Sequence, residues 1–115
     1  MQGSFFRFYV RENDRHHGRL VWEWLMERAN KLGIRGGSAF RAVAGFGRHH
    51  VLHESTVFEL SGSETVEVEF ILSEQEAQKL LSLLREHKVR LFYAQIPALF
   101  GVLNPDRDDP PNKNT

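Results

Sequence analysis

Residues 65–86 read TVEVEFILSEQEAQKLLSLLRE and contain the clearest strand pattern of this 115-residue chain. From residue 66 to residue 70, apolar side chains alternate with glutamates, which predicts a strand with one buried face and one wet face. Ser73 and Glu76 then match the S-x-x-E capping box, so we expect a helix to begin directly after the strand. The expected buried stripe of this helix is Ala77, Leu80, Leu81 and Leu84.

The segments on either side of this unit predict further strands and one more helix. Strands are expected at 4–11, 38–47 and 89–96, an extended segment at 56–60, and a helix at 20–32. In the first strand, Phe6, Phe8 and Val10 share one side. Trp22 and Trp24 are two residues apart on the helix and cannot share a face, so we expect only Trp24 in the core.

The order of these elements is β-α-β-β-α-β, which indicates a ferredoxin-like α+β fold: an antiparallel sheet with two helices on one face. Two helices leave the other face of the sheet uncovered. Aromatic residues make up 11% of the chain, more than one small core requires. The surplus residues are Phe5, Tyr9, Phe92, Phe100 and Phe40. We therefore expect the second face to be buried against other copies of the protein.

Composition excludes several classes of function. Fifteen basic residues balance fifteen acidic ones, which argues against a nucleic-acid partner held by phosphate neutralisation. The absence of cysteine excludes thiolate chemistry and disulfides. No apolar run approaches ~18 residues and no leader pattern is present. We therefore expect a cytoplasmic protein that does not insert into a membrane. We expect one domain over residues 1–103 and a disordered tail, rich in proline and charge, over 104–115.

Residues 32–60, LGIRGGSAFRAVAGFGRHHVLHESTVFEL, carry a resemblance to a known family. Leu32-Gly33-Ile34 close the first helix, Gly36 or Gly37 opens the second strand, and Gly45-Phe46-Gly47 end it. This arrangement resembles the PII-like family called domain of unknown function 190, and more distantly the nitrogen regulatory protein P-II. The spacing fits from residue 6 to residue 96. The resemblance implies a ferredoxin-like subunit in a compact trimer, with the three sheets facing the threefold axis.

The resemblance also implies a function. In P-II proteins a small effector, usually an adenine nucleotide, binds between neighbouring subunits, and a loop after Gly-Phe-Gly-Arg signals to a membrane transporter or an enzyme. Here that loop is residues 48–55, and a membrane transporter or channel is the implied partner. The chain departs from P-II where Ala39 replaces an adenine-binding threonine and where HKVR, residues 87–90, replaces the phosphate-binding loop. The uncharacterised family shares most of these departures and is the nearer relative.

Candidate ligand-binding residues follow from chemistry and from this resemblance. They are Arg41, Gly45, Phe46, Gly47, Arg48, Lys88 and Arg90. Glycine lets a ligand approach the backbone, and arginine suits phosphate or carboxylate. Each has a structural alternative. The glycines fit a turn at the strand end, Arg41 or Arg48 could pair with Glu67 or Glu69, and the last two cations could be solvated ends of elements.

Histidines offer a second hypothesis, and catalytic motifs are missing from the sequence. His49, His50 and His53 lie in one segment and suggest a metal-binding or pH-sensitive loop, whereas His16 and His17 are expected to face solvent. His53-Glu54-Ser55 are adjacent, so on an extended chain they point to opposite sides and cannot form a relay. We therefore expect no enzyme and no cofactor needed for folding. A PII-like regulator, a His-loop metal-binding protein and a ligand-free oligomeric adaptor stay open, with a small hydrolase as a remote fourth hypothesis.

Overall fold

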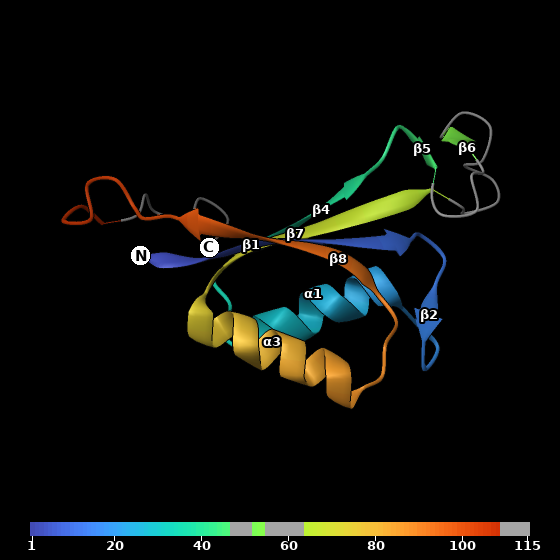
Figure 1. Ribbon diagram of the computed structural model, residues 1–115, viewed down its shortest axis with the longest axis horizontal. Coiled ribbons are helices and arrows are strands. Elements are labelled where there is room, and N and C mark those ends of the chain that lie inside the picture. Colours follow the sequence, from blue (N-terminus) through green and yellow to red (C-terminus); the bar gives the residue numbers. More distant parts are fainter. Residues whose placement is uncertain (47–51, 55–63, 109–115) are drawn as a thin grey trace.

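The computed structural model describes residues 1–46, 52–54 and 64–108. Four strands form one antiparallel sheet in the order β4-β7-β1-β8, and helices α1 and α3 lie on the same face of it (Figure 1). The elements are β1 (Gln2–Arg11), β2 (Arg15–His16), β3 (Arg19–Leu20), α1 (Val21–Lys31), β4 (Gly37–Arg41), β5 (Ala44–Phe46), β6 (Leu52–Glu54), β7 (Thr65–Ser73), α3 (Glu74–Glu86) and β8 (Phe92–Leu99). This is the expected ferredoxin-like α+β fold with two helices on one face.

The core lies between the sheet and the two helices. Alternate residues of β1 and β7 point toward the helices, because successive side chains of a strand face opposite sides. Phe6, Phe8 and Val10 are buried as expected, and the two phenylalanines meet Trp24 of α1 and Leu80 of α3 in one cluster. Trp22 is only partly buried, so the expected choice between the two tryptophans is confirmed.

The boundaries of both helices follow from local chemistry. At the start of α3, the Ser73 side chain accepts a hydrogen bond from the Glu76 backbone N–H at 3.2 Å, and Glu76 Oε1 accepts one from the Ser73 N–H at 2.8 Å. The predicted capping box is therefore present. Gly33 follows α1 with φ of +85°, a conformation that glycine adopts without steric cost, which explains the end of that helix.

The second strand differs from the prediction, which placed one strand at 38–47. β4 ends at Arg41, and the chain then leaves the sheet to form β5, which pairs with β6 in a separate two-stranded ribbon (Figure 1). The cause is the length of the partner strand. Ala42 donates a backbone hydrogen bond to Thr65 at 2.8 Å, and Thr65 is where β7 begins, so the sheet offers no further partner.

The last strand was predicted at 89–96, ending before a proline, and both limits are wrong. β8 spans Phe92–Leu99 and runs through Pro97, which lies opposite Ser4 of β1. Because β8 is an edge strand, a residue without an N–H is tolerated there. Residues 13–18 (NDRHHG), expected as a loop, instead include β2 and the turn of a short hairpin that continues into β3.

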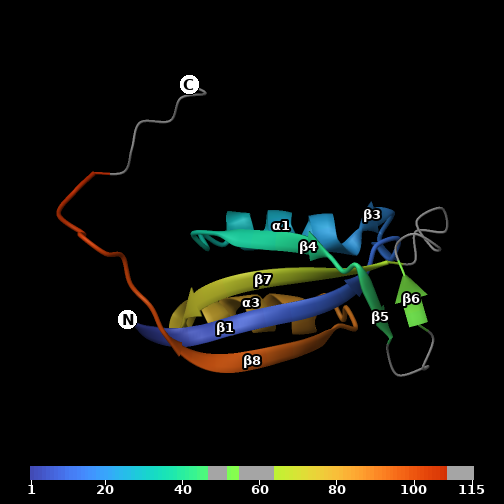
Figure 2. The ribbon, with the colours of Figure 1, turned by 90° about the horizontal axis from the view of Figure 1, so that it is seen from above.

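The C-terminal residues extend away from the sheet. Phe100 still pairs with Met1 through two backbone hydrogen bonds of 2.9 and 3.0 Å, and residues 101–108 are exposed and leave the sheet edge (Figure 2). The predicted disorder of 104–115 stays a prediction, because residues 109–115 lie outside the described part of the chain, as does the extended segment expected at 56–60. Neither of the described helices is long and apolar enough to cross a membrane.

Candidate functional site

The face of the sheet opposite the helices carries large apolar side chains. Register places Phe5 between Ile71 and Ile96, and Tyr9 beside Phe92, all pointing away from the helices. Phe92 is 74% exposed, and Phe40, Ile71 and Ile96 are about half exposed. Tyr9 and Phe92 touch, with ring centroids 5.4 Å apart. This uncovered face is the surplus aromatic surface that the composition indicated.

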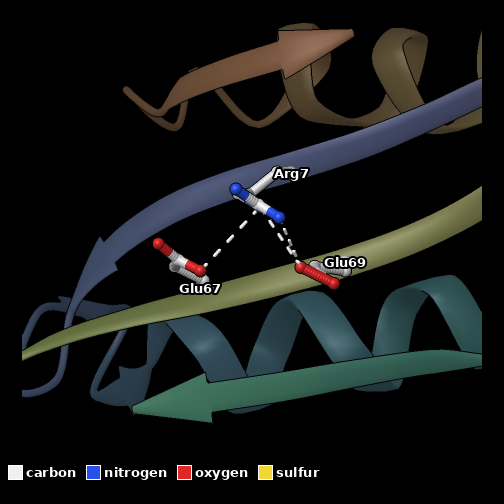
Figure 3. A network of polar contacts seen from close by, with 3 residues as sticks. All are labelled: Arg7, Glu67 and Glu69. Atoms are coloured by element: carbon white, nitrogen blue, oxygen red, sulfur yellow. Dashed lines mark hydrogen bonds and ion pairs between the residues drawn. The ribbon is translucent and has the colours of Figure 1, made fainter. Parts of the chain in front are cut away.

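A charged cluster lies in the middle of the uncovered face (Figure 3). Arg7 Nη2 is 3.1 Å from Glu69 Oε2, and Arg7 Nε is 3.8 Å from Glu67 Oε2. The alternative that Arg41 pairs with Glu67 or Glu69 is therefore wrong, because Arg7 already occupies both carboxylates and Arg41 lies on the other side of the sheet. Arg48 lies outside the described residues.

Arg41 instead belongs to a cluster where three strand ends meet. It ends β4, Glu12 directly follows β1, and Glu64 directly precedes β7. Arg41 Nη2 donates to Glu12 Oε1, and the Glu12 N–H donates to the Glu64 backbone carbonyl at 2.8 Å. Glu64 is only 3% exposed. The hydrogen bond from Arg41 lowers the pKa of Glu12 below its ordinary value, and the same bond, with a smaller contribution from the charge of Glu64, raises the pKa of Arg41.

Gly45 lies in β5 without a described structural need for glycine. A Cβ built there would meet no heavy atom of the described residues within 4 Å, and its φ is not positive. Gly37 is the opposite case, since its Cβ would lie 2.4 Å from the Phe70 ring. The described residues therefore give no steric reason for glycine at position 45, and the approach of a ligand to its backbone stays a prediction.

The remaining candidates divide between exposed and undescribed positions. Lys88 and Arg90 are exposed after the end of α3, and Lys88 has φ of +55° in the turn that ends the helix. They lie at the same end of the sheet as Arg41. β8 begins opposite Tyr9 of β1, and Arg41 at the end of β4 is opposite Val66, which pairs with Val10 of β1, so both positions are near the end of β1. The Phe46 and His53 side chains and all of Gly47, Arg48, His49 and His50 lie outside the described part.

One histidine cluster was missed by the sequence reasoning, which expected His16 to face solvent. His16 is half buried in the hairpin β2–β3, with its ring 4.8 Å from Trp24, 4.3 Å from His17 and 5.8 Å from His87. Its Nε2 is buried without a hydrogen-bond partner among the described residues. Burial, followed by the nearby charges of His17 and His87, lowers the pKa of His16. His17 and Gly18, with φ of 50° and 81°, form the tight turn of this hairpin, so the X-Gly pair was a local signal for the turn but not for the contacts of His16 with Trp24 and His87.

Two hollows lie on the described part of the chain, and neither is lined by the candidate ligand residues. A hollow of about 240 Å³ lies between α1 and β4, lined in part by Met26, Arg35 and Phe70, and another lies beside Gln2 and Leu99; neither includes Arg41 or Gly45. Among the described residues, no group of three histidine, cysteine or acidic side chains is arranged to hold a metal ion. The hypothetical His49, His50 and His53 metal site falls on residues whose side chains are not described.

Comparison with known proteins resolves the family. A family model for DUF190, described as "Uncharacterized ACR", matches residues 3–92. The chain belongs to the DUF190 family. The chain is 32% identical over 75 residues to a UPF0166 protein of Aquifex aeolicus, covering 65% of this chain and 71% of the relative. It is 27% identical over 86 residues to a UPF0166 protein of Methanocaldococcus jannaschii, covering 75% and 79%.

A solved structure shares the fold of this DUF190 protein. The crystal structure of a protein from Thermus thermophilus, described as a PII-like signalling protein, aligns with a TM-score of 0.52. The alignment covers 86% of this chain and 90% of that chain at 16% sequence identity. The α+β, PII-like fold expected from the sequence is therefore confirmed.

Proposed function

We propose that this DUF190 protein is a non-enzymatic, PII-like regulatory protein. It assembles as a homotrimer, binds a small anionic effector of the adenine-nucleotide class between subunits, and signals through residues 48–55. Its partner is a second protein, of the membrane transporter or channel class that the family resemblance implies. The observation that carries the proposal is the uncovered apolar face of a PII-like sheet.

The apolar character of the uncovered face supports self-association of the protein. Phe5, Tyr9, Phe92 and Ile96 would each remain partly solvated in a monomer, whereas monomeric proteins rarely expose a contiguous apolar patch of this kind. The Arg7 charge in its middle already has Glu67 and Glu69 as partners. A closely approaching copy would therefore not bury an unpaired cation.

The composition of the candidate site supports an anionic effector. Arg41, Lys88 and Arg90 lie at one end of the sheet, and Gly45 offers backbone that a ligand can approach. Neither of the two hollows described above includes these residues, which fits a site completed by a neighbouring subunit. The zero net charge of the chain means that local cations, and not an overall basic field, must attract the ligand.

Thermal-shift and calorimetric titration with adenine nucleotides, cyclic nucleotides and bicarbonate test the proposal. A true effector at a hundredfold excess over its Kd should stabilise the native state by about 2.7 kcal/mol, and Arg48→Ala should weaken that effect. Lys79→Ala, a cation removed from the exposed side of α3, is the matched control. Failure of every ligand to stabilise the protein, or equal binding by Arg48→Ala and wild type, would contradict the effector part of the proposal.

A further inference from the structure

The ion pair between Arg41 and Glu12 lies at the point where the chain leaves the sheet. Arg41 is the last residue of β4, and the ribbon β5–β6 begins two residues beyond Ala42. Register and strand alternation place Arg41, Glu12 and Glu64 on the helix-bearing side, because each is in phase with Val66 or Val10. The pair thus closes over the start of β7 at the base of the ribbon.

The Arg41 end of this pair is open to an incoming ligand. Its side chain is 59% exposed, and that of Glu12 is 23% exposed. A guanidinium has five N–H donors in a planar fork, and the described contacts use one nitrogen of Arg41, on Glu12. An ion pair this exposed is weak, so a multiply charged oxyanion can compete with a single carboxylate for it.

Buried Glu64 makes the loss of the Arg41–Glu12 ion pair costly. Glu64 is almost fully buried, and its Oε2 has no hydrogen-bond partner among the described residues. Glu12 and Glu64 lie together, and Arg41 is the cation that interacts electrostatically with both. Withdrawal of Arg41 would leave two carboxyl groups side by side with one of them buried, which costs free energy unless the segment moves.

We propose that Glu12 is an internal competitor for the effector. The phosphate or carboxylate group of the effector binds Arg41 by displacing Glu12, and the displacement releases the hinge at Ala42 and Val43 that carries the ribbon β5–β6. Val43 is 79% exposed, and among the described residues it is the backbone bond from Ala42 to Thr65 that ties this hinge to the sheet. This inference rests on the proposed function, and it supplies the step by which occupancy of the site reaches residues 48–55.

The test compares Glu12→Gln with the matched control Glu27→Gln. Glu27 lies on α1 and pairs with Arg19 of β3 and with Lys31 of α1, so the control also removes one ion-paired carboxylate. Calorimetric titration uses ATP and AMP as probes at fixed ionic strength. Glu12→Gln should bind the nucleotide about two- to fivefold more tightly than wild type, while Glu27→Gln stays at the wild-type value. Hydrogen exchange at the Ala42 amide should rise when ATP binds wild type, and should already be raised in nucleotide-free Glu12→Gln.

Each outcome separates this inference from the effector proposal. If wild type binds nucleotide and Glu12→Gln binds no more tightly, the competition is wrong and the effector proposal stands. If Glu27→Gln tightens binding equally, the effect is one of overall charge and the competition is again wrong. If no form binds either probe, both the competition between Glu12 and effector and the adenine-nucleotide effector itself are wrong. If hydrogen exchange at the Ala42 amide is the same in Glu12→Gln and wild type, the Arg41–Glu12 ion pair does not hold the hinge.

Discussion

Arg7 and Glu69 lie opposite each other on β1 and β7, with Nη2 and Oε2 3.1 Å apart, in the centre of the sheet face that no described helix covers. Aromatic and aliphatic side chains surround this pair, so the face is apolar at its rim and charge-paired in its middle. A second copy packed on this face would bury the apolar side chains, and because Arg7 is already paired it would not bury an unpaired cation.

A charge introduced at Phe92 should break the proposed trimer without unfolding the subunit. Phe92 is 74% exposed and packs on Tyr9, so Phe92→Glu removes little from the core of one chain but places a carboxylate in the interface. Light scattering should show a lower mass, with the Trp24 near-ultraviolet signal retained. Leu103→Glu, at a 91% exposed position beyond the sheet, should keep the wild-type mass. Equal masses for wild type and Phe92→Glu would argue against this face as the interface.

Gly45 and Gly37 should respond in opposite ways to alanine. A Cβ at Gly37 would lie 2.4 Å from the Phe70 ring, so Gly37→Ala should lower the melting temperature by forcing β4 or Phe70 to shift. A Cβ at Gly45 would meet no atom of the described part of the chain within 4 Å, so Gly45→Ala should melt like wild type. Titration with ATP should nevertheless show weaker binding by Gly45→Ala. Unchanged binding would mean that no ligand approaches the backbone there.

Stability should fall as the pH drops below neutrality because of His16. Its folded-state pKa is lowered, chiefly by burial, so the unfolded chain binds the proton more readily. The stability contributed by neutral His16 is therefore present above its ordinary pKa of about 6.5 and is lost as the pH falls through the window below it. The groups that face His16 are His17 from its own hairpin, Trp24 from α1 and His87 from the end of α3.

His16→Phe keeps a ring against Trp24 and removes the titration. Its melting temperature should depend less on pH between about 7 and 5 than that of wild type, as followed by tryptophan fluorescence. His17→Asn, in which asparagine tolerates the positive φ, removes only a charge contribution smaller than burial, so it should reduce the pH dependence less than His16→Phe does. If His16→Phe keeps the full wild-type dependence, another group causes it.

The capping box should contribute measurable stability. Ser73→Ala removes the acceptor for the Glu76 N–H and should cost about 1 kcal/mol, a fall of roughly 4 °C in melting temperature. Ser82→Ala, at an exposed position within α3, should cost nothing, because alanine is the better helix former. Equal melting temperatures for the two variants would mean that the helix start is held by packing alone.

Local patterns predicted those parts of the fold that depend on local chemistry. The capping box of Ser73 and Glu76, the buried side of β1 and the choice of Trp24 over Trp22 all follow from periodicity and hydrogen-bonding groups. Strand limits did not follow, because they depend on where the partner strand begins or ends. β4 stops at Arg41 since β7 starts at Thr65, and β8 passes Pro97 since it lies at an edge.

The candidate site was predictable only in part. Arg41 was chosen for its chemistry and its place in the strand, but its partner Glu12 is 29 residues away in the chain and is brought close only by the order of strands. Glu64 carried no pattern of its own, and its burial follows from its position before β7. The His16 cluster was overlooked for the same reason, since His87 reaches it through the packing of α3.

The mass of the wild-type protein in solution tests the central claim most directly, because the interface, the shared site and the signalling role all depend on assembly. Light scattering coupled to gel filtration should give three chains of 13.3 kDa, about 40 kDa, over a range of concentrations. A stable species of 13.3 kDa with native Trp24 signal would contradict the trimer, and with it the site between subunits.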